Sequence, residues 1–166
     1  MNISRSDLYT YVASLFASDL LDAEGNLLLD KYGIALASKD FVLNNIYWKE
    51  VPQTLTATDV SKGFMVMKLE QLSDNSEMLL ETYCDTRMYI ECYVPSIKAS
   101  NISGVINKKK YDAIQKVVDE IILSECKKVN QPYTISRDVV LSMDDFYTNG
   151  TNTFFLYITS FSITIN

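Results

Sequence analysis

The chain has 166 residues, of which 48% are hydrophobic and 22% are charged, and its 21 acidic and 15 basic side chains give a formal charge of −6. This length suits one domain with a substantial core, and the hydrophobic content excludes a mostly disordered chain. The absence of histidine excludes His-based triads, His general bases and His metal ligands. We expect residues 1–166 to form a single domain, with residues 22–62 as an insertion or extension.

Charge and cysteine content bear on partners. A charge of −6 opposes non-specific binding to nucleic acid and suits either simple solubility or a surface along which DNA slides without binding. Cys84, Cys92 and Cys126 are odd in number and lie in apolar segments, so we expect free buried thiols and neither disulfides nor zinc ligands. The sequence shows no secretory leader and no apolar run of about 20 residues, so we expect no membrane partner.

The first predicted element is a helix over residues 7–21. Its apolar residues recur at helical spacing and form one stripe: Leu8, Tyr11, Val12, Leu15, Phe16 and Leu20. Residues 27–53 are apolar without a period. They contain the only tryptophan, Trp48, beside Tyr47, a pair that suits either the core or a contact site.

From Gly63 onward the apolar period changes to two, which predicts strands. The first covers residues 64–69, and a long second strand covers residues 78–94 and is ended by Pro95. In the second strand, alternation places Tyr89 and Tyr93 on an outer, aromatic and charged face.

The clearest helix covers residues 107–128. Ile114, Val118, Ile121 and Ile122 belong to its buried stripe, and we expect Lys116, Asp119 and Glu120 to lie outside. Three consecutive lysines, residues 108–110, open this helix. They are either a solvated run or a site for an acidic partner, since basic residues are unfavourable at a helix start.

The chain closes with strands over residues 133–143 and 153–165, separated by a turn over residues 144–150 that ends in Asn-Gly. Both faces of the last strand are apolar in its first half, which predicts a central strand or one covered by another subunit. The expected fold class is α+β, with a mixed or antiparallel sheet of about four to five strands and two main helices packed on it.

No signature of chemistry accompanies this pattern. Phosphate-binding loops, dinucleotide fingerprints and nucleophile elbows are absent from the sequence. Asp138, Asp144 and Asp145 could in principle hold magnesium, but the last two lie in the predicted turn, where Asp is common for backbone reasons. We therefore expect no enzyme, no catalytic residue, no cofactor and no bound metal.

The order of elements resembles the fold of the phage tail-terminator, tail-completion and neck protein family. The likeness is carried by the helix at 7–21, the hairpin at 63–94, the helix at 107–128 and the two closing strands, roughly two thirds of the chain. The bias toward Asn, Ile, Lys and Tyr resembles phages of low GC content, such as the crAss-like group. Residues 22–62 depart from the family by being longer than its usual connection.

The resemblance implies a virion structural protein, made in the host bacterial cytoplasm, that forms a ring in the phage neck or tail. Six or twelve copies would contact one another and the neighbouring neck or tail proteins. DNA would pass through the channel without specific binding. In such a ring, each copy needs two different contact patches.

The interface candidates are aromatic residues in segments that fit poorly into a lone domain: Tyr47, Trp48, Tyr89, Tyr93, Phe146 and Tyr147. Two other functions stay open. One is a small soluble bacterial ligand-binding or accessory domain, which would have a closed pocket. The other, opposed by the net charge, is a nucleic-acid-binding module that uses residues 108–110.

Overall fold

A computed structural model of the chain describes residues 5–17, 45–71, 85–96, 102–128, 133–136 and 143–165. The elements follow in the order α1 (Arg5–Ala17), β1 (Ile46–Trp48), α2 (Ala57–Lys62), β2 (Phe64–Gln71), β3 (Asp85–Ser96), α3 (Ile102–Cys126), β4 (Tyr133–Ser136), β5 (Met143–Asn149) and β6 (Asn152–Ile165). The fold is α+β, as the sequence predicts, and its sheet has six strands where about four to five were expected.

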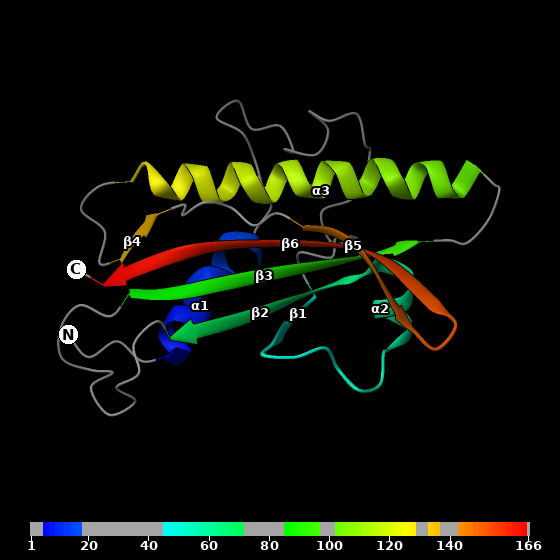
Figure 1. The fold of residues 1–166 in the computed structure, drawn as a ribbon, viewed down its shortest axis with the longest axis horizontal. Coiled ribbons are helices and arrows are strands. Elements are labelled where there is room, and N and C mark those ends of the chain that lie inside the picture. Colours follow the sequence, from blue (N-terminus) through cyan, green and yellow to red (C-terminus); the bar gives the residue numbers. More distant parts are fainter. Residues whose placement is uncertain are drawn as a thin grey trace.

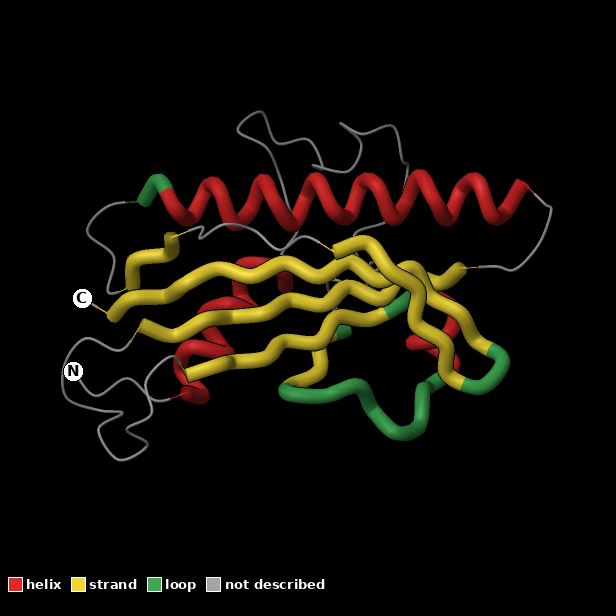
Figure 2. The backbone as a smooth tube through the Cα atoms, viewed as in Figure 1, coloured by secondary structure: helices red, strands yellow, loops and turns green. Residues whose placement is uncertain are grey.

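The sheet is mixed, with the strand order β1-β2-β3-β6-β4, and β5 pairs with β6 as well (Figures 1 and 2). β1 runs parallel to β2, and every other pair is antiparallel. β6 lies between β3 on one side and β4 and β5 on the other, which confirms its predicted central position. The longest helix, α3, extends along the sheet (Figure 1).

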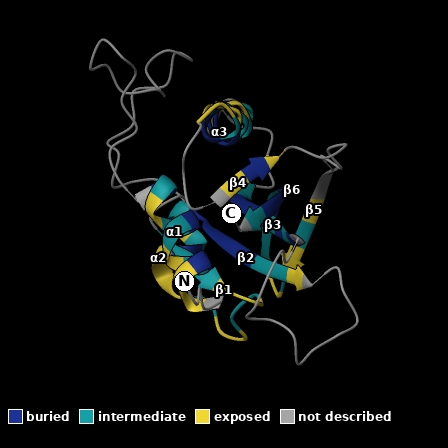
Figure 3. Cartoon of the chain, turned by 90° about the vertical axis from the view of Figure 1, so that its left-hand side faces the viewer, coloured by how far each residue is buried: buried dark blue, intermediate teal, exposed yellow. Residues whose placement is uncertain are grey.

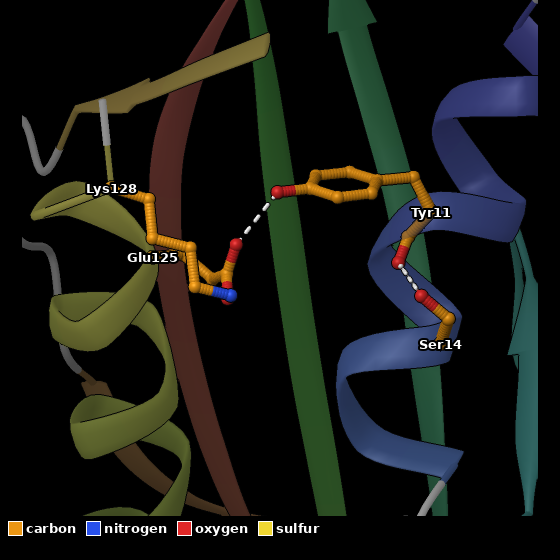
Figure 4. A network of polar contacts seen from close by, with 4 residues as sticks. All are labelled: Tyr11, Ser14, Glu125 and Lys128. Carbon is orange, nitrogen blue, oxygen red and sulfur yellow. Dashed lines mark hydrogen bonds and ion pairs between the residues drawn. The ribbon is translucent and has the colours of Figure 1, made fainter. Parts of the chain in front are cut away.

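Helices α1 and α3 pack side by side on one face of the sheet. Trp48 is paired with Met67 in the β1–β2 register, and its ring contacts Tyr9 of α1. On the same face, Tyr111 of α3 packs against Phe155 of β6. Figure 3 shows the buried side of α3 turned toward the strands, and Figure 4 shows both helices in front of the sheet. This packing buries the apolar stripes of both helices.

The predicted phase of the α3 stripe is confirmed. Ile114 and Val118 are fully buried, Ile122 is 2% exposed and Ile121 is 9% exposed. Lys116 is exposed, as expected, whereas Glu120 is half-buried and not outside. Asp119 is half-buried and not outside, because its carboxylate accepts a hydrogen bond from the Tyr157 hydroxyl of β6 at 2.8 Å.

Truncation of this stripe should destabilise the fold. We expect Ile121→Ala to lower the free energy of unfolding by about 2–5 kcal/mol, because it leaves a cavity between α3 and the sheet. Leu123→Ala is the matched control, since Leu123 lies on the same helix but is 41% exposed. Its effect should stay within about 0.5 kcal/mol. Urea denaturation followed by circular dichroism measures both, and equal losses would show that the packing is not as described.

The end of β3 differs from the prediction. Pro95 does not end the strand, which continues to Ser96. β2 begins at Phe64, paired with Tyr93, so that Pro95 lies beyond β2 and is flanked by β6 alone. Proline is tolerated at such an edge position, because the strand needs no hydrogen bond from a backbone N–H there.

The predicted turn over residues 144–150 is also corrected. Residues 143–149 form strand β5, and the turn is confined to Gly150 and Thr151. Pairing with β6 along the whole of β5 overrides the low strand propensity of its two aspartates. Gly150 has φ +61°, the left-handed conformation that a tight hairpin turn requires.

Helix boundaries shift as well. α3 begins at Ile102, five residues earlier than predicted, so residues 108–110 lie in its second and third turns and do not open it. α1 begins at Arg5, and the expected continuation over 18–21 lies outside the described residues. The same holds for residues 22–44, for residues 78–84 of the predicted strand 78–94 and for residues 137–142 of the predicted strand 133–143.

Candidate functional site

The six aromatic interface candidates fall into three classes of exposure. Trp48 on β1 is 42% exposed and Phe146 on β5 is 62% exposed. Tyr47, Tyr89 and Tyr147 are half-buried. The expectation for Tyr93 is wrong, because this residue is 3% exposed and belongs to the core of its own chain.

Tyr93 is buried because an aromatic cluster closes over that end of the sheet. Its ring stacks on Phe64 with centroids 4.5 Å apart, and Tyr147 of β5 packs edge-on against it at 5.1 Å. The Tyr93 hydroxyl donates to Glu91 at 2.7 Å, and burial followed by this hydrogen bond raises the pKa of Tyr93. Period-two alternation identifies the face of this residue correctly but gives no sign that other aromatics cover it.

The first exposed aromatic surface lies at the β1 edge of the sheet, and we call it the Trp48 patch. It consists of Trp48 and Tyr9, whose ring centroids lie 4.6 Å apart at an interplanar angle of 65°. The residue after Trp48 is Lys49, which has φ +74°. Its backbone N–H donates to the Met67 carbonyl at 2.8 Å, and this bond marks the end of β1. The patch therefore joins α1 to the outermost strand of the described sheet.

The second surface lies at the β5–β6 hairpin, and we call it the Phe146 patch. It consists of Phe146, Phe155 and Lys108, and its two phenylalanine rings lie 5.2 Å apart. The Lys108 ammonium lies 5.8 Å from the centroid of Phe155 and 4.6 Å from that of Tyr111, and it forms an ion pair with Asp112 at 3.0 Å. The charge beside aromatic faces is a favourable cation–π arrangement.

The two patches lie at opposite edges of the sheet. Among the described strands, β1 pairs only with β2. β5 pairs with β6, which is the third strand after β1 in the order of the sheet. The two patches also differ in composition, because the Phe146 patch includes the Lys108 ammonium 5.8 Å from a phenylalanine ring, whereas the Trp48 patch joins a tryptophan to a tyrosine. A chain with two unlike patches can make head-to-tail contacts, whereas a two-fold contact uses one patch twice.

A polar link fixes the two helices that support these surfaces. The Tyr11 hydroxyl of α1 donates to Glu125 of α3 at 2.7 Å (Figure 4). Glu125 is 8% exposed and also pairs with Lys128, which follows the helix. The Ser14 hydroxyl donates to the Tyr11 carbonyl at 2.6 Å, within α1.

Removal of the Tyr11 hydroxyl should loosen the contact between α1 and α3. We expect Tyr11→Phe to lower the free energy of unfolding by about 1–3 kcal/mol, because it leaves a nearly buried carboxylate with one donor fewer. Tyr89→Phe is the control, since the Tyr89 hydroxyl donates to Glu70 at 2.7 Å in an exposed pair. Thermal unfolding of both variants compares them, and equal effects would contradict the role given to Glu125.

The described residues give little support for a metal site or a reactive cysteine. They contain no group of three metal-ligating side chains. Asp138 lies outside them, and the side chains of Asp144 and Asp145 are not described. Cys92 is a fully buried thiol outside any disulfide, and desolvation raises its pKa, so it is a poor nucleophile. Cys126 forms no disulfide either, but it is half-buried and not buried as expected. Cys84 lies outside the described residues.

The α3 surface carries one hollow of about 550 Å³. Its described lining residues come from this helix and from the residue that directly follows it: Lys116, Asp119, Glu120, Leu123, Ser124 and Lys127. Ligand pockets are usually enclosed by several elements, so this hollow gives weak support to a ligand-binding domain. Of the lysine run, Lys108 is exposed and already paired with Asp112, and the side chains of residues 109 and 110 are not described.

Sequence reasoning missed the polar cluster around Asp59. Asp59 is fully buried in α2, and Asn45, Tyr47 and Thr56 donate hydrogen bonds to its carboxylate. The available signal was the capping-box spacing of Thr56 and Asp59, which marks the start of a helix.

None of the described helices is long and apolar enough to cross a membrane. Comparisons with protein-family models and with curated proteins find no match to the sequence.

Proposed function

We propose that this protein is a structural subunit of a bacteriophage virion, which assembles head-to-tail into a ring in the neck or tail. The observation that carries the proposal is the pair of unlike aromatic patches at opposite edges of one sheet. The Trp48 patch of one copy would contact the Phe146 patch of the next. Because the two patches differ, the contact is heterologous, and a rotation that closes gives a ring.

Strand directions support this arrangement. β1 runs parallel to β2, and the antiparallel steps to β3, β6 and β5 leave β1 and β5 running in opposite directions. If all copies in a ring have the same orientation, β1 of one copy and β5 of the next would therefore run antiparallel where they meet. The exposed aromatics at these edges suit contact surfaces, where Trp and Phe are enriched.

The phage assignment rests on the order of elements and on composition, which resemble the tail-terminator and neck family. A net charge of −6 would suit a channel that DNA crosses without binding. A non-enzymatic role agrees with the absence of catalytic motifs from the sequence.

Native mass spectrometry of the purified protein over a range of concentrations tests the proposal. We expect closed rings, of six or twelve copies by family resemblance, with neither open chains nor a ladder of sizes. Image averages of the same sample should show a flat particle with a central channel. A two-fold dimer, or a protein that stays monomeric at every concentration, would contradict the proposal and favour a soluble ligand-binding or accessory domain.

A further inference from the structure

The carboxylate of Asp59 is surrounded by hydrogen-bond donors from three residues. The Thr56 N–H and hydroxyl donate to it at 2.7 and 2.8 Å, and the Tyr47 hydroxyl lies 3.0 Å from both carboxylate oxygens. The side-chain amide of Asn45 donates to it as well and reaches the Gly63 carbonyl at 3.3 Å. A fully buried carboxylate with this many donors is stable only in its ionised form.

These bonds fasten β1 to the rest of the fold. Asn45 and Tyr47 belong to the β1 segment, whereas Asp59 belongs to α2, which leads directly into β2. β1 itself has only three residues, lies at the edge of the described sheet and pairs in parallel with β2. A parallel pair this short contributes little stability by itself, so the Asp59 cluster is the main polar anchor of the strand.

The electrostatics favour the charged carboxylate. Burial alone would raise the pKa of Asp59, but the hydrogen bonds from Thr56, Asn45 and Tyr47 outweigh it and hold this pKa below its usual value. Tyr47 is the titratable group that contacts it from β1, and burial and Asp59 raise the pKa of that tyrosine. On α2 itself, Lys62 in the last turn is the other charged side chain.

We propose that Asp59 is an ionisable latch, which holds the edge strand β1 and the Trp48 patch on the sheet and can open while the rest of the sheet stays folded. The strands β2, β3 and β6 can stay folded because long antiparallel ladders join them, independently of β1. The local latch does not depend on the proposed function. Its consequence for assembly, that rings need the latch closed, does rest on that function.

The direction of the pH dependence follows from the lowered pKa. The stabilisation of β1 is complete above the ordinary Asp pKa of about 4 and is lost as the pH falls through the lower pKa of the folded state. Acid should therefore release β1, whereas neutral and alkaline solutions below the range of Tyr47 ionisation should keep it in place.

Trp48 is the only tryptophan of the chain, so its fluorescence reports on β1 alone. In an acid titration of the intact protein, we expect the Trp48 emission to shift to the red and its quenching by acrylamide to rise. These changes should come at a higher pH than the loss of far-ultraviolet circular dichroism. Asp59→Asn should show the released Trp48 signal already at pH 7, since an amide places a donor among donors.

Asp112→Asn is the matched control, because it makes the same chemical change at a half-exposed ion pair on α3. It should leave the Trp48 signal and its titration unchanged. Tyr47→Phe is a milder variant that keeps the ring and removes one donor, so it should move the Trp48 transition to higher pH.

Two results would overturn the latch: a wild-type acid titration in which Trp48 emission and circular dichroism change together, or a folded Asp59→Asn protein with the wild-type quenching. If Asp59→Asn fails to fold, the wild-type and Tyr47→Phe titrations decide. The outcome stays separate from the proposed function when all of these signals are recorded below the concentration at which the protein self-associates, because they are then read from the monomer.

Discussion

Gly63→Ala should be the most destabilising single substitution among those considered, with an expected loss of about 3–5 kcal/mol of unfolding free energy. Gly63 has φ +91° and ψ −178°, a region that is essentially restricted to glycine and costs other residues roughly 1–3 kcal/mol. A Cβ atom at this position would also lie 2.2 Å from the Tyr93 carbonyl oxygen. That contact is with backbone, so β2 and β3 would have to separate at the end where the aromatic cluster packs.

Gly150→Ala is the natural control. Gly150 also has a positive φ, +61°, but a Cβ there meets nothing within 4 Å. Its expected loss is that of the backbone conformation alone, roughly 1–2 kcal/mol. Urea denaturation of both variants separates the contact from the conformation, and similar losses would show that the approach of Gly63 to Tyr93 is not as tight as described.

The second large effect concerns association. We expect Trp48→Ala and Phe146→Ala each to weaken self-association by about 2 kcal/mol or more, which is roughly a 30-fold rise in the dissociation constant. Large exposed aromatics of this kind often dominate interface energies when they become desolvated. Leu123→Ala removes an apolar side chain that is about as exposed as Trp48, from the α3 surface, and should leave association unchanged.

Sedimentation velocity at several concentrations measures the association of the three variants. Far-ultraviolet circular dichroism and urea denaturation must show in parallel that each stays folded, because Trp48 also packs against Tyr9. If Leu123→Ala weakened association as much as the two patch variants, the contact surface would lie on α3 and not at the sheet edges.

Strong periodicity made the central part of the fold predictable. The stripe of α3 that contains Ile114 and Val118 leaves only one way to face the core, and the apolar residues on both faces of β6 predict a central strand. The helix has the predicted phase, and the strand has the predicted central position. The start of β2 at Phe64 was predictable for a similar reason, because Gly63 marks the change of period.

Elements that depend on distant partners were not predictable. β1 has three residues and acquires its strand conformation from pairing with β2, and nothing local in residues 46–48 requires it. β5 reads as a turn because Asp144 and Asp145 are poor strand formers, and only the neighbouring β6 makes it a strand. Helix α2, six residues long, is fixed by the capping box of Thr56 and Asp59 and by the donors of β1.

The same distinction applies to the candidate contact residues. The sequence shows that Tyr93 and Phe146 are aromatic residues in segments with unusual patterns, but it does not show which of them other parts of the chain cover. Stacking on Phe64 places Tyr93 in the core, whereas Phe146, whose ring contacts the half-buried ring of Phe155, stays 62% exposed. Burial is a property of the tertiary packing, so the exposure of each candidate had to come from the structure.

A mixing experiment tests the head-to-tail contact most directly. Trp48→Ala keeps an intact Phe146 patch, and Phe146→Ala keeps an intact Trp48 patch, so every contact within one variant alone lacks an aromatic side chain and does not form at a concentration well below its raised dissociation constant. An equimolar mixture restores one intact contact per pair, and native mass spectrometry should detect a heterodimer of the two variants that neither forms alone and that does not grow into a ring. A mixture that stays monomeric while the wild type assembles, or a homodimer of either variant, would contradict the contact between the two patches.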